Sequence, residues 1–85
     1  MSSITFNMPS LAICKSSGLS LFALENDVYD KQELSVILEG GDITIFPIPK
    51  SLLGKKEIYS YINNICDDFE SGNIDHYPER YKIHI

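Results

Sequence analysis

The second half of the chain carries an apolar stripe that restricts the fold more than any other feature of the sequence. Four large apolar side chains recur at the spacing i, i+4, i+7, i+11: Ile58, Ile62, Ile65 and Phe69. This spacing places them on one face of an α-helix. Gly72 follows as a C-terminal cap, because glycine adopts the left-handed backbone at little cost. The pattern predicts a helix within residues 51–72 that buries this face against another layer.

Short apolar segments typical of strands make up most of the remaining chain. The expected strands cover residues 3–6, 19–25, 43–46 and 81–85. Pro47 and Pro49 end the third of these, since proline cannot donate to a sheet ladder. A second, shorter helix is expected over residues 9–16, because Asn7-Met8-Pro9 is a typical helix start and Gly18 supplies a stop.

Residues 30–39 fit either a helix or the first strand of a hairpin. Asp30 and Glu33 have the spacing of a capping box, which favours a helix. In the hairpin, Gly40-Gly41 is a two-residue turn, and the strands on either side share one wholly apolar face. The cross-strand pairs of that face are Leu38 with Ile43 and Val36 with Ile45. Because such a consistent register seldom arises by chance, the hairpin is the preferred interpretation.

With these elements the expected order is β-α-β-β-β-α-β. The predicted fold class is α+β, a two-layer sandwich in which helices cover one face of a mainly antiparallel sheet. A chain of 85 residues buries only about 60 to 65 per cent of its unfolded surface, so one thin core is expected. The whole sequence, residues 1–85, is therefore interpreted as a single domain.

The charge of the chain restricts its partners. The formal net charge is −5, so nucleic acids and anionic membranes are repelled, and a basic protein is the expected partner. Residues 1–8 lack the basic and apolar regions of a secretory signal. No apolar stretch approaches the roughly 20 residues that a membrane-spanning helix needs. A cytoplasmic location is the expectation.

Catalytic and metal-binding motifs are sparse. Cys14 and Cys66 lie far apart in apolar segments, outside any metal-ligand spacing, and are expected to be buried free thiols. His76 and His84 are too few to complete a zinc site. No serine lies in a Gly-x-Ser-x-Gly context. We therefore expect no enzymatic activity, no cofactor and no metal.

Two acidic segments, each with a tyrosine, are the candidate partner-binding sites. The first lies within residues 67–79, contains no Lys or Arg, and has these candidate residues: Asp67, Asp68, Glu70, Asp75, Tyr77 and Glu79. The second surrounds Tyr29 with Asp27 and Asp30. Charge of one sign attracts an oppositely charged partner. Tyr77, expected in an exposed loop, would anchor the interface.

Two stretches of the chain carry a family resemblance. They are Ala12-Ile13-Cys14-Lys15-Ser16-Ser17-Gly18-Leu19 and Ile62-Asn63-Asn64-Ile65-Cys66-Asp67-Asp68-Phe69-Glu70-Ser71-Gly72. In this layout, in length and in acidity the chain resembles immunity proteins that protect bacteria from anticodon-cleaving ribonuclease colicins and from contact-dependent inhibition toxins. The resemblance implies a protein that covers the RNA groove of a basic ribonuclease toxin domain, with carboxylates imitating phosphates and tyrosines imitating bases. It does not extend to residues 27–49 and assigns no individual contact residue.

Two other functions stay open. A phage-encoded inhibitor of a host defence or nucleic-acid enzyme would present the same acidic surface. A small ligand-binding or enzyme domain would instead require a concave pocket with convergent polar groups. The sequence favours the immunity or inhibitor function.

Overall fold

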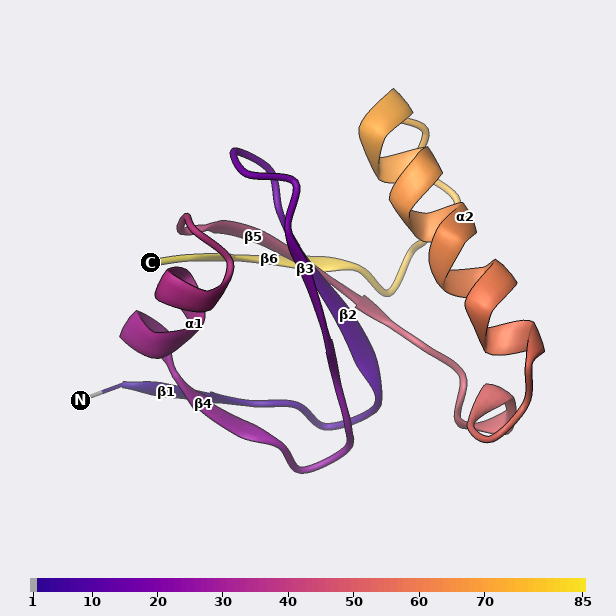
Figure 1. Cartoon of the computed structure of the whole chain (residues 1–85), viewed down its shortest axis with the longest axis horizontal. Coiled ribbons are helices and arrows are strands. Elements are labelled where there is room, and N and C mark those ends of the chain that lie inside the picture. Colours follow the sequence, from indigo (N-terminus) through magenta and orange to yellow (C-terminus); the bar gives the residue numbers. More distant parts are fainter. Residues whose placement is uncertain (1) are drawn as a thin grey trace.

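The computed structural model describes residues 2–85 and shows an α+β fold with two antiparallel sheets and two α-helices (Figure 1). The main sheet has the strand order β3-β2-β5-β6, with these bounds: β2 (Ser10–Cys14), β3 (Ser20–Ala23), β5 (Asp42–Pro47) and β6 (Tyr81–His84). A separate two-stranded ribbon pairs β1 (Ser3–Thr5) with β4 (Val28–Asp30). The helices are α1 (Lys31–Ile37) and α2 (Glu57–Ser71), and a 3-10 turn (Lys50–Leu52) lies between β5 and α2.

The α+β class and the antiparallel main sheet confirm the prediction, and the element order matches roughly. The layering differs from the predicted two-layer sandwich, because the helices cover opposite faces of the main sheet. Leu34 of α1 packs in one core with Phe6, and Ile65 of α2 packs in another with Phe46. The main sheet is therefore the middle layer of three, and Figure 1 shows α1 and α2 on its two sides.

The segment expected as a helix over residues 9–16 is instead the central strand β2, so that prediction is wrong. All five residues of β2 are buried. Alternate side chains face opposite cores: Leu11 and Ile13 on the α2 side, Ala12 and Cys14 on the α1 side. A strand buried on both faces shows no polar alternation, so its apolar run also fits helical spacing. Gly18, with a φ of 75°, lies in the turn that joins β2 to β3.

The preferred hairpin over residues 36–45 is also wrong, and the helical alternative is right. The Asp30 carboxylate accepts hydrogen bonds at 2.9 and 3.3 Å from two backbone N–H groups in the first turn of α1. Leu34 and Leu38, one helical turn apart, are both fully buried. Val36, which the hairpin would place on its apolar face, is 75% exposed. Packing of the two leucines on the sheet and the Asp30 cap favour the helix over the turn.

The two glycines after α1 allow close packing instead of forming a hairpin turn. A Cβ at Gly40 would lie 2.5 Å from Cys14 Sγ and from Ser16 Oγ. A Cβ at Gly41 would lie 2.5 Å from the backbone oxygen of Ile85. Both distances are far below an ordinary van der Waals contact, so any other residue would displace the β2 turn or the end of the chain.

The predicted stripe is confirmed in α2, which ends at Gly72 with a φ of 82°. Ile65 is fully buried, and its partly buried neighbours on the same core are Ile58, Tyr61, Ile62, Cys66 and Phe69. The helix starts later than predicted, since Gly54, with a φ of 76°, interrupts the chain after the 3-10 turn. The expected strands over 3–6, 19–25, 43–46 and 81–85 correspond to β1, β3, β5 and β6. Within residues 2–85, neither helix is long and apolar enough to cross a membrane.

Candidate functional site

The loop that joins α2 to β6 folds back onto the sheet and shapes the first predicted binding segment. Tyr77 in this loop packs edge-to-face on Phe46 of β5, with ring centroids 5.4 Å apart. Phe69 of α2 packs on the same phenylalanine at 5.9 Å. Tyr77 is therefore half-buried, and the expectation of an exposed anchor is wrong. Its ring stabilises the α2 side of the fold.

Asp68 ties this loop to the end of α2. Its Oδ2 accepts a hydrogen bond of 2.6 Å from the Tyr77 hydroxyl and lies 3.2 Å from Nε2 of His76. Burial, together with the Asp68 carboxylate, raises the pKa of Tyr77 to about 12. A carboxylate near a helix C terminus is disfavoured by the helix dipole, and these two contacts offset that cost.

Several other predicted carboxylates have partners within the fold. Asp75 Oδ1 lies 3.5 Å from Nη2 of Arg80, whose Nη1 also donates to the carbonyl of Tyr77 at 2.9 Å. Asp27 accepts a hydrogen bond from the backbone N–H of Leu24 at 2.8 Å. Asp30 caps α1. These three carboxylates therefore stabilise turns and the start of a helix.

The second acidic segment lies on the other side of the main sheet. Tyr29 of β4 is half-buried and packs edge-to-face on Phe6 at 6.0 Å, within the α1 core. Tyr77 belongs to the α2 core. Because the sheet separates these cores, the two candidate segments do not form one surface.

Three of the predicted carboxylates keep their charge exposed. Within residues 2–85, none of them forms an ion pair or a side-chain hydrogen bond: Asp67, Glu70 and Glu79. Asp67 and Glu70 are three residues apart on α2, so they are neighbours on the helix surface. Glu79 follows in the loop. Within the first acidic segment, these three carboxylates are therefore the ones free to contact a partner.

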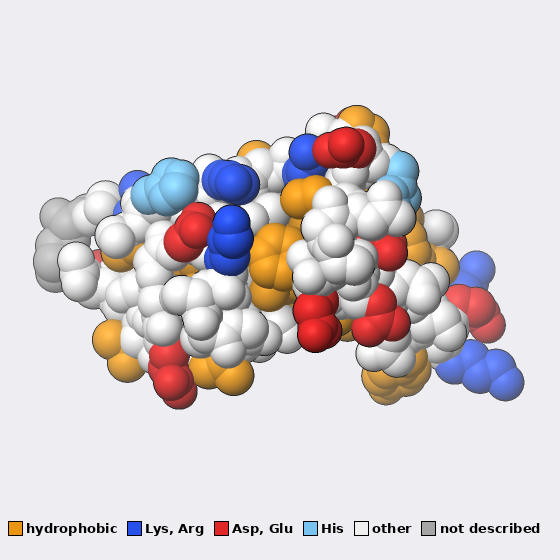
Figure 2. Space-filling view, turned by 90° about the horizontal axis from the view of Figure 1, so that it is seen from above, with side chains coloured by type: hydrophobic (Ala, Val, Ile, Leu, Met, Phe, Trp, Pro, Cys, Tyr) orange, Lys and Arg blue, Asp and Glu red, His pale blue; other side chains and the backbone are white. Residues whose placement is uncertain are grey.

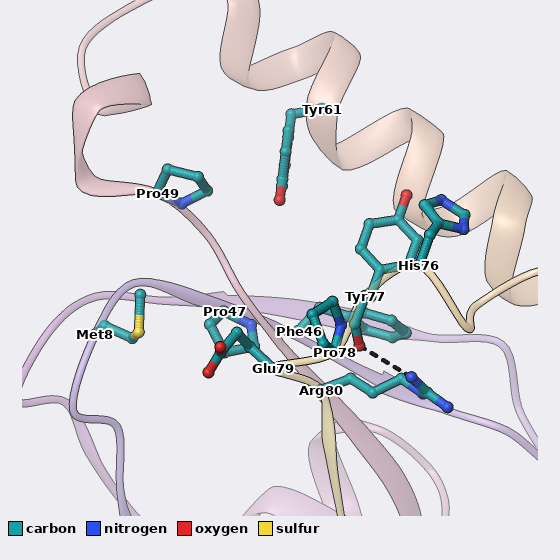
Figure 3. Close-up of a pocket in the computed structure, with 10 residues that line it drawn as sticks. All are labelled: Met8, Phe46, Pro47, Pro49, Tyr61, His76, Tyr77, Pro78, Glu79 and Arg80. Atoms are coloured by element: carbon teal, nitrogen blue, oxygen red, sulfur yellow. Dashed lines mark hydrogen bonds between the residues drawn. The ribbon is translucent and has the colours of Figure 1, made fainter.

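A cavity of about 190 Å³ opens beside Glu79 (Figure 3). Tyr61 projects toward it from α2, and Tyr77 and Pro78 line it from the loop. Pro47, at the end of β5, completes the apolar wall. Among the lining residues, Glu79 is the one carboxylate and Arg80 the one Lys or Arg. The aromatic rings of Tyr61 and Tyr77 offer a cationic side chain a cation–π contact, and Glu79 lies in the same lining.

The cysteines do not form a reactive site. Burial opposes ionisation of Cys14, but hydrogen bonds from Ser16 and Ser17 outweigh it and lower the pKa to about 7. The Cys14 side chain has no exposed surface, so this thiol is enclosed. Burial, with a smaller contribution from Asp67, raises the pKa of the half-buried Cys66 thiol and disfavours its thiolate. Among residues 2–85, no cluster of His, Cys, Asp and Glu side chains is suited to hold a metal ion.

Of the predicted residues, Tyr77 and Glu79 line the cavity, whereas Asp68 and Asp75 contact two of its lining residues, Tyr77 and Arg80. The sequence analysis missed the contribution of Tyr61, because helical periodicity marks it as a core residue and does not show which loop folds over it. Comparisons of this chain with protein-family models, with curated protein sequences and with solved structures gave no match.

Proposed function

We propose that this chain is an inhibitor that docks on a basic protein domain through the end of α2 and the loop that follows. In this proposal it acts as an immunity protein and covers the RNA-binding groove of a ribonuclease toxin domain. The observation that carries the proposal is an aromatic cavity lined by the exposed Glu79, together with the exposed Asp67 and Glu70 near the C-terminal end of α2. A groove that binds RNA phosphates presents Lys and Arg, which such a surface attracts.

Stability does not account for the exposed acids at the end of α2. A carboxylate in the last turns of a helix costs about 0.3 to 1 kcal/mol through the helix dipole. For Asp68, the contacts with Tyr77 and His76 offset that cost. Asp67 and Glu70 have no such contact among the described residues. A partner that supplies positive charge would offset their cost on binding.

The cavity gives the proposed interface a defined contact. It is large enough for the end of one long side chain, and its walls include the rings of Tyr61 and Tyr77. A Lys or Arg of the partner placed there would contact these rings and lie close to Glu79. The exposed carboxylates outside the cavity would mainly raise the association rate and make it sensitive to salt.

The test is inhibition of purified anticodon-cleaving ribonuclease toxin domains, with tRNA cleavage as the readout. Glu79→Lys is compared with Glu39→Lys, which lies after α1 and changes the net charge equally. We expect Glu79→Lys to weaken inhibition at least about tenfold, as for a close charge pair, and Glu39→Lys to have little effect. High salt should weaken inhibition by the unaltered protein.

Two results would contradict the proposal. One is that the protein inhibits none of the toxin domains and binds no basic protein at low salt. The other is equal inhibition by the Glu79→Lys and Glu39→Lys variants, which would show that the surface around Glu79 is not part of the interface.

A further inference from the structure

A second hollow lies on the α2 side of the sheet, near the C-terminal end of α2. It is a groove of about 700 Å³ between that helix end, the turn after β2, and strands β5 and β6. Figure 2 shows hydrophobic side chains in the hollow. Lys or Arg side chains lie beside it on the sheet side, next to an Asp or Glu side chain, and further Asp or Glu side chains lie over the helix. In Figure 1, α2 lies beside one end of the main sheet, so the helix leaves part of this face uncovered.

The register of the main sheet sets the floor of the groove. Ile13 of β2 pairs with Thr44 of β5, and Thr44 pairs with Lys82 of β6. Directly paired residues place their side chains next to each other on one face. Lys15, two residues after Ile13, lines the same groove. Two lysines that are far apart in the sequence therefore line the same groove.

The charge of the groove is opposite to that of the chain. Its lining contains two lysines and one carboxylate, Glu70, although the chain has a net charge of −5. Neither Lys15 nor Lys82 forms an ion pair in the part of the chain that the structure describes. The groove is thus a local positive site on an acidic protein, and it favours an anion.

Thr44 adds a neutral polar group to this site. Thr44 is only 2% exposed and lines the groove from β5, which lies between β2 and β6 in the sheet. A threonine hydroxyl is able to donate a hydrogen bond to a bound ligand.

We infer that this groove binds a small organic anion with an apolar body. The acidic group lies between Lys15 and Lys82, within reach of the Thr44 hydroxyl, and the apolar body packs on Ile13 and Phe69. The volume is within the range of about 300 to 1,000 Å³ that is usual for small-molecule sites. This groove shares no lining residue with the cavity beside Glu79, although Glu70 belongs both to the groove and to the proposed docking surface. The inference does not depend on the proposed inhibitor function.

The test is a titration of the isotope-labelled protein with octanoate, followed by amide chemical shifts. Octylammonium, which has the same chain length and the opposite charge, is the control ligand. We expect octanoate to give saturable shifts at Ile13, Thr44 and Lys82, and octylammonium to give none there. Octylammonium shifts at the same amides and with the same affinity would overturn the inference, because the site would then be merely apolar.

Variants separate the contribution of each group to octanoate binding. Lys15→Gln and Lys82→Gln should each weaken binding about tenfold, as expected for loss of a charge-assisted contact. Thr44→Val should weaken it by a smaller factor. Lys55→Gln, which removes a positive charge before α2, is the matched control and should have little effect. Equal affinity of the Lys15→Gln, Lys82→Gln and Lys55→Gln variants, each folded by circular dichroism, would also overturn the inference.

Discussion

The two faces of the main sheet differ in how completely they are filled. On the α1 face, every residue of the buried cluster has no exposed surface. On the α2 face, fewer residues are fully buried, and most of the side chains around them are partly exposed. Both hollows open on the α2 face. The comparison indicates that the α1 face mainly provides stability, whereas the α2 face carries the side chains available for binding.

The difference follows from what covers each face. The short helix α1 and the β1–β4 ribbon together close one face, with Leu34, Leu38, Phe6 and the half-buried Tyr29 in one cluster. On the other face, the longer helix α2 is joined by the 3-10 turn, which contributes Leu52, and by the loop to β6, which contributes Ile74 and Tyr77. An amphipathic helix at one end of a sheet leaves grooves along its sides.

The largest expected effect is a loss of stability on the α1 face. Leu34→Ala should lower the free energy of unfolding by about 2 to 5 kcal/mol, because the residue is fully buried and leaves a cavity. Ile62→Ala on the α2 face should cost less, since Ile62 is only partly buried. Urea denaturation measures both. An equal or larger loss for Ile62→Ala would remove the distinction between the two faces.

A smaller effect is expected at the start of α1. Asp30→Ala should lower the free energy of unfolding by about 0.5 to 2 kcal/mol, because it removes the helix cap. Glu33→Ala is the matched control, since this carboxylate caps nothing among the described residues and should cost less. Thermal unfolding followed by circular dichroism compares them. If Asp30→Ala weakened partner binding without changing stability, the α1 side would have to be part of the interface.

On the α2 face, Tyr77→Phe should lower the free energy of unfolding by about 0.5 to 1.5 kcal/mol. The substitution keeps the ring against Phe46 but removes the hydrogen bond to Asp68. Tyr59→Phe is the control, because Tyr59 is 71% exposed and should tolerate the change. Urea denaturation at neutral pH provides the measurement, and equal stability of the two variants would show that the Asp68 bond contributes nothing net.

The smallest effect is confined to alkaline pH. The folded-state pKa of Tyr77 is about 12, above the unfolded value of about 10, so folding favours the protonated phenol. The stability that this provides is fully present below a pH of about 10 and is lost as the pH rises toward about 12. Burial also raises the pKa of Tyr81. Tyrosinate absorbance should therefore show a late-titrating component, and the part that titrates toward pH 12 should disappear in Tyr77→Phe. If all five tyrosines of the unaltered protein titrated together near pH 10, the raised pKa would be refuted.

Several elements follow directly from local patterns in the sequence. The stripe of α2 and its glycine cap, and the apolar alternation around Ile43 and Ile45, depend mostly on neighbours along the chain. The strand β2 could not be recognised in this way. Its burial on both faces depends on α1 and α2, and its apolar run therefore lacks the polar alternation that would distinguish it from a helix.

The acidic residues of the candidate site were chosen from charge alone, and their role in binding stays a prediction. Charge does not show which of them have partners within the fold and which stay exposed. Asp68 and Tyr77 are nine residues apart, and their hydrogen bond depends on how the loop returns to β5. The groove had no signal in the sequence, because Lys15 and Lys82 meet only through the pairing of β2, β5 and β6.

The sequence by itself determined the α+β class, the position of α2 and the excess of acidic side chains. The tertiary structure decided which face each helix covers, which carboxylates stay exposed, and where the two hollows open. The physical reason is that periodicity and charge report the immediate neighbours of a residue along the chain. Burial on both faces of a strand, and the pairing of distant side chains, depend on segments that only folding brings together.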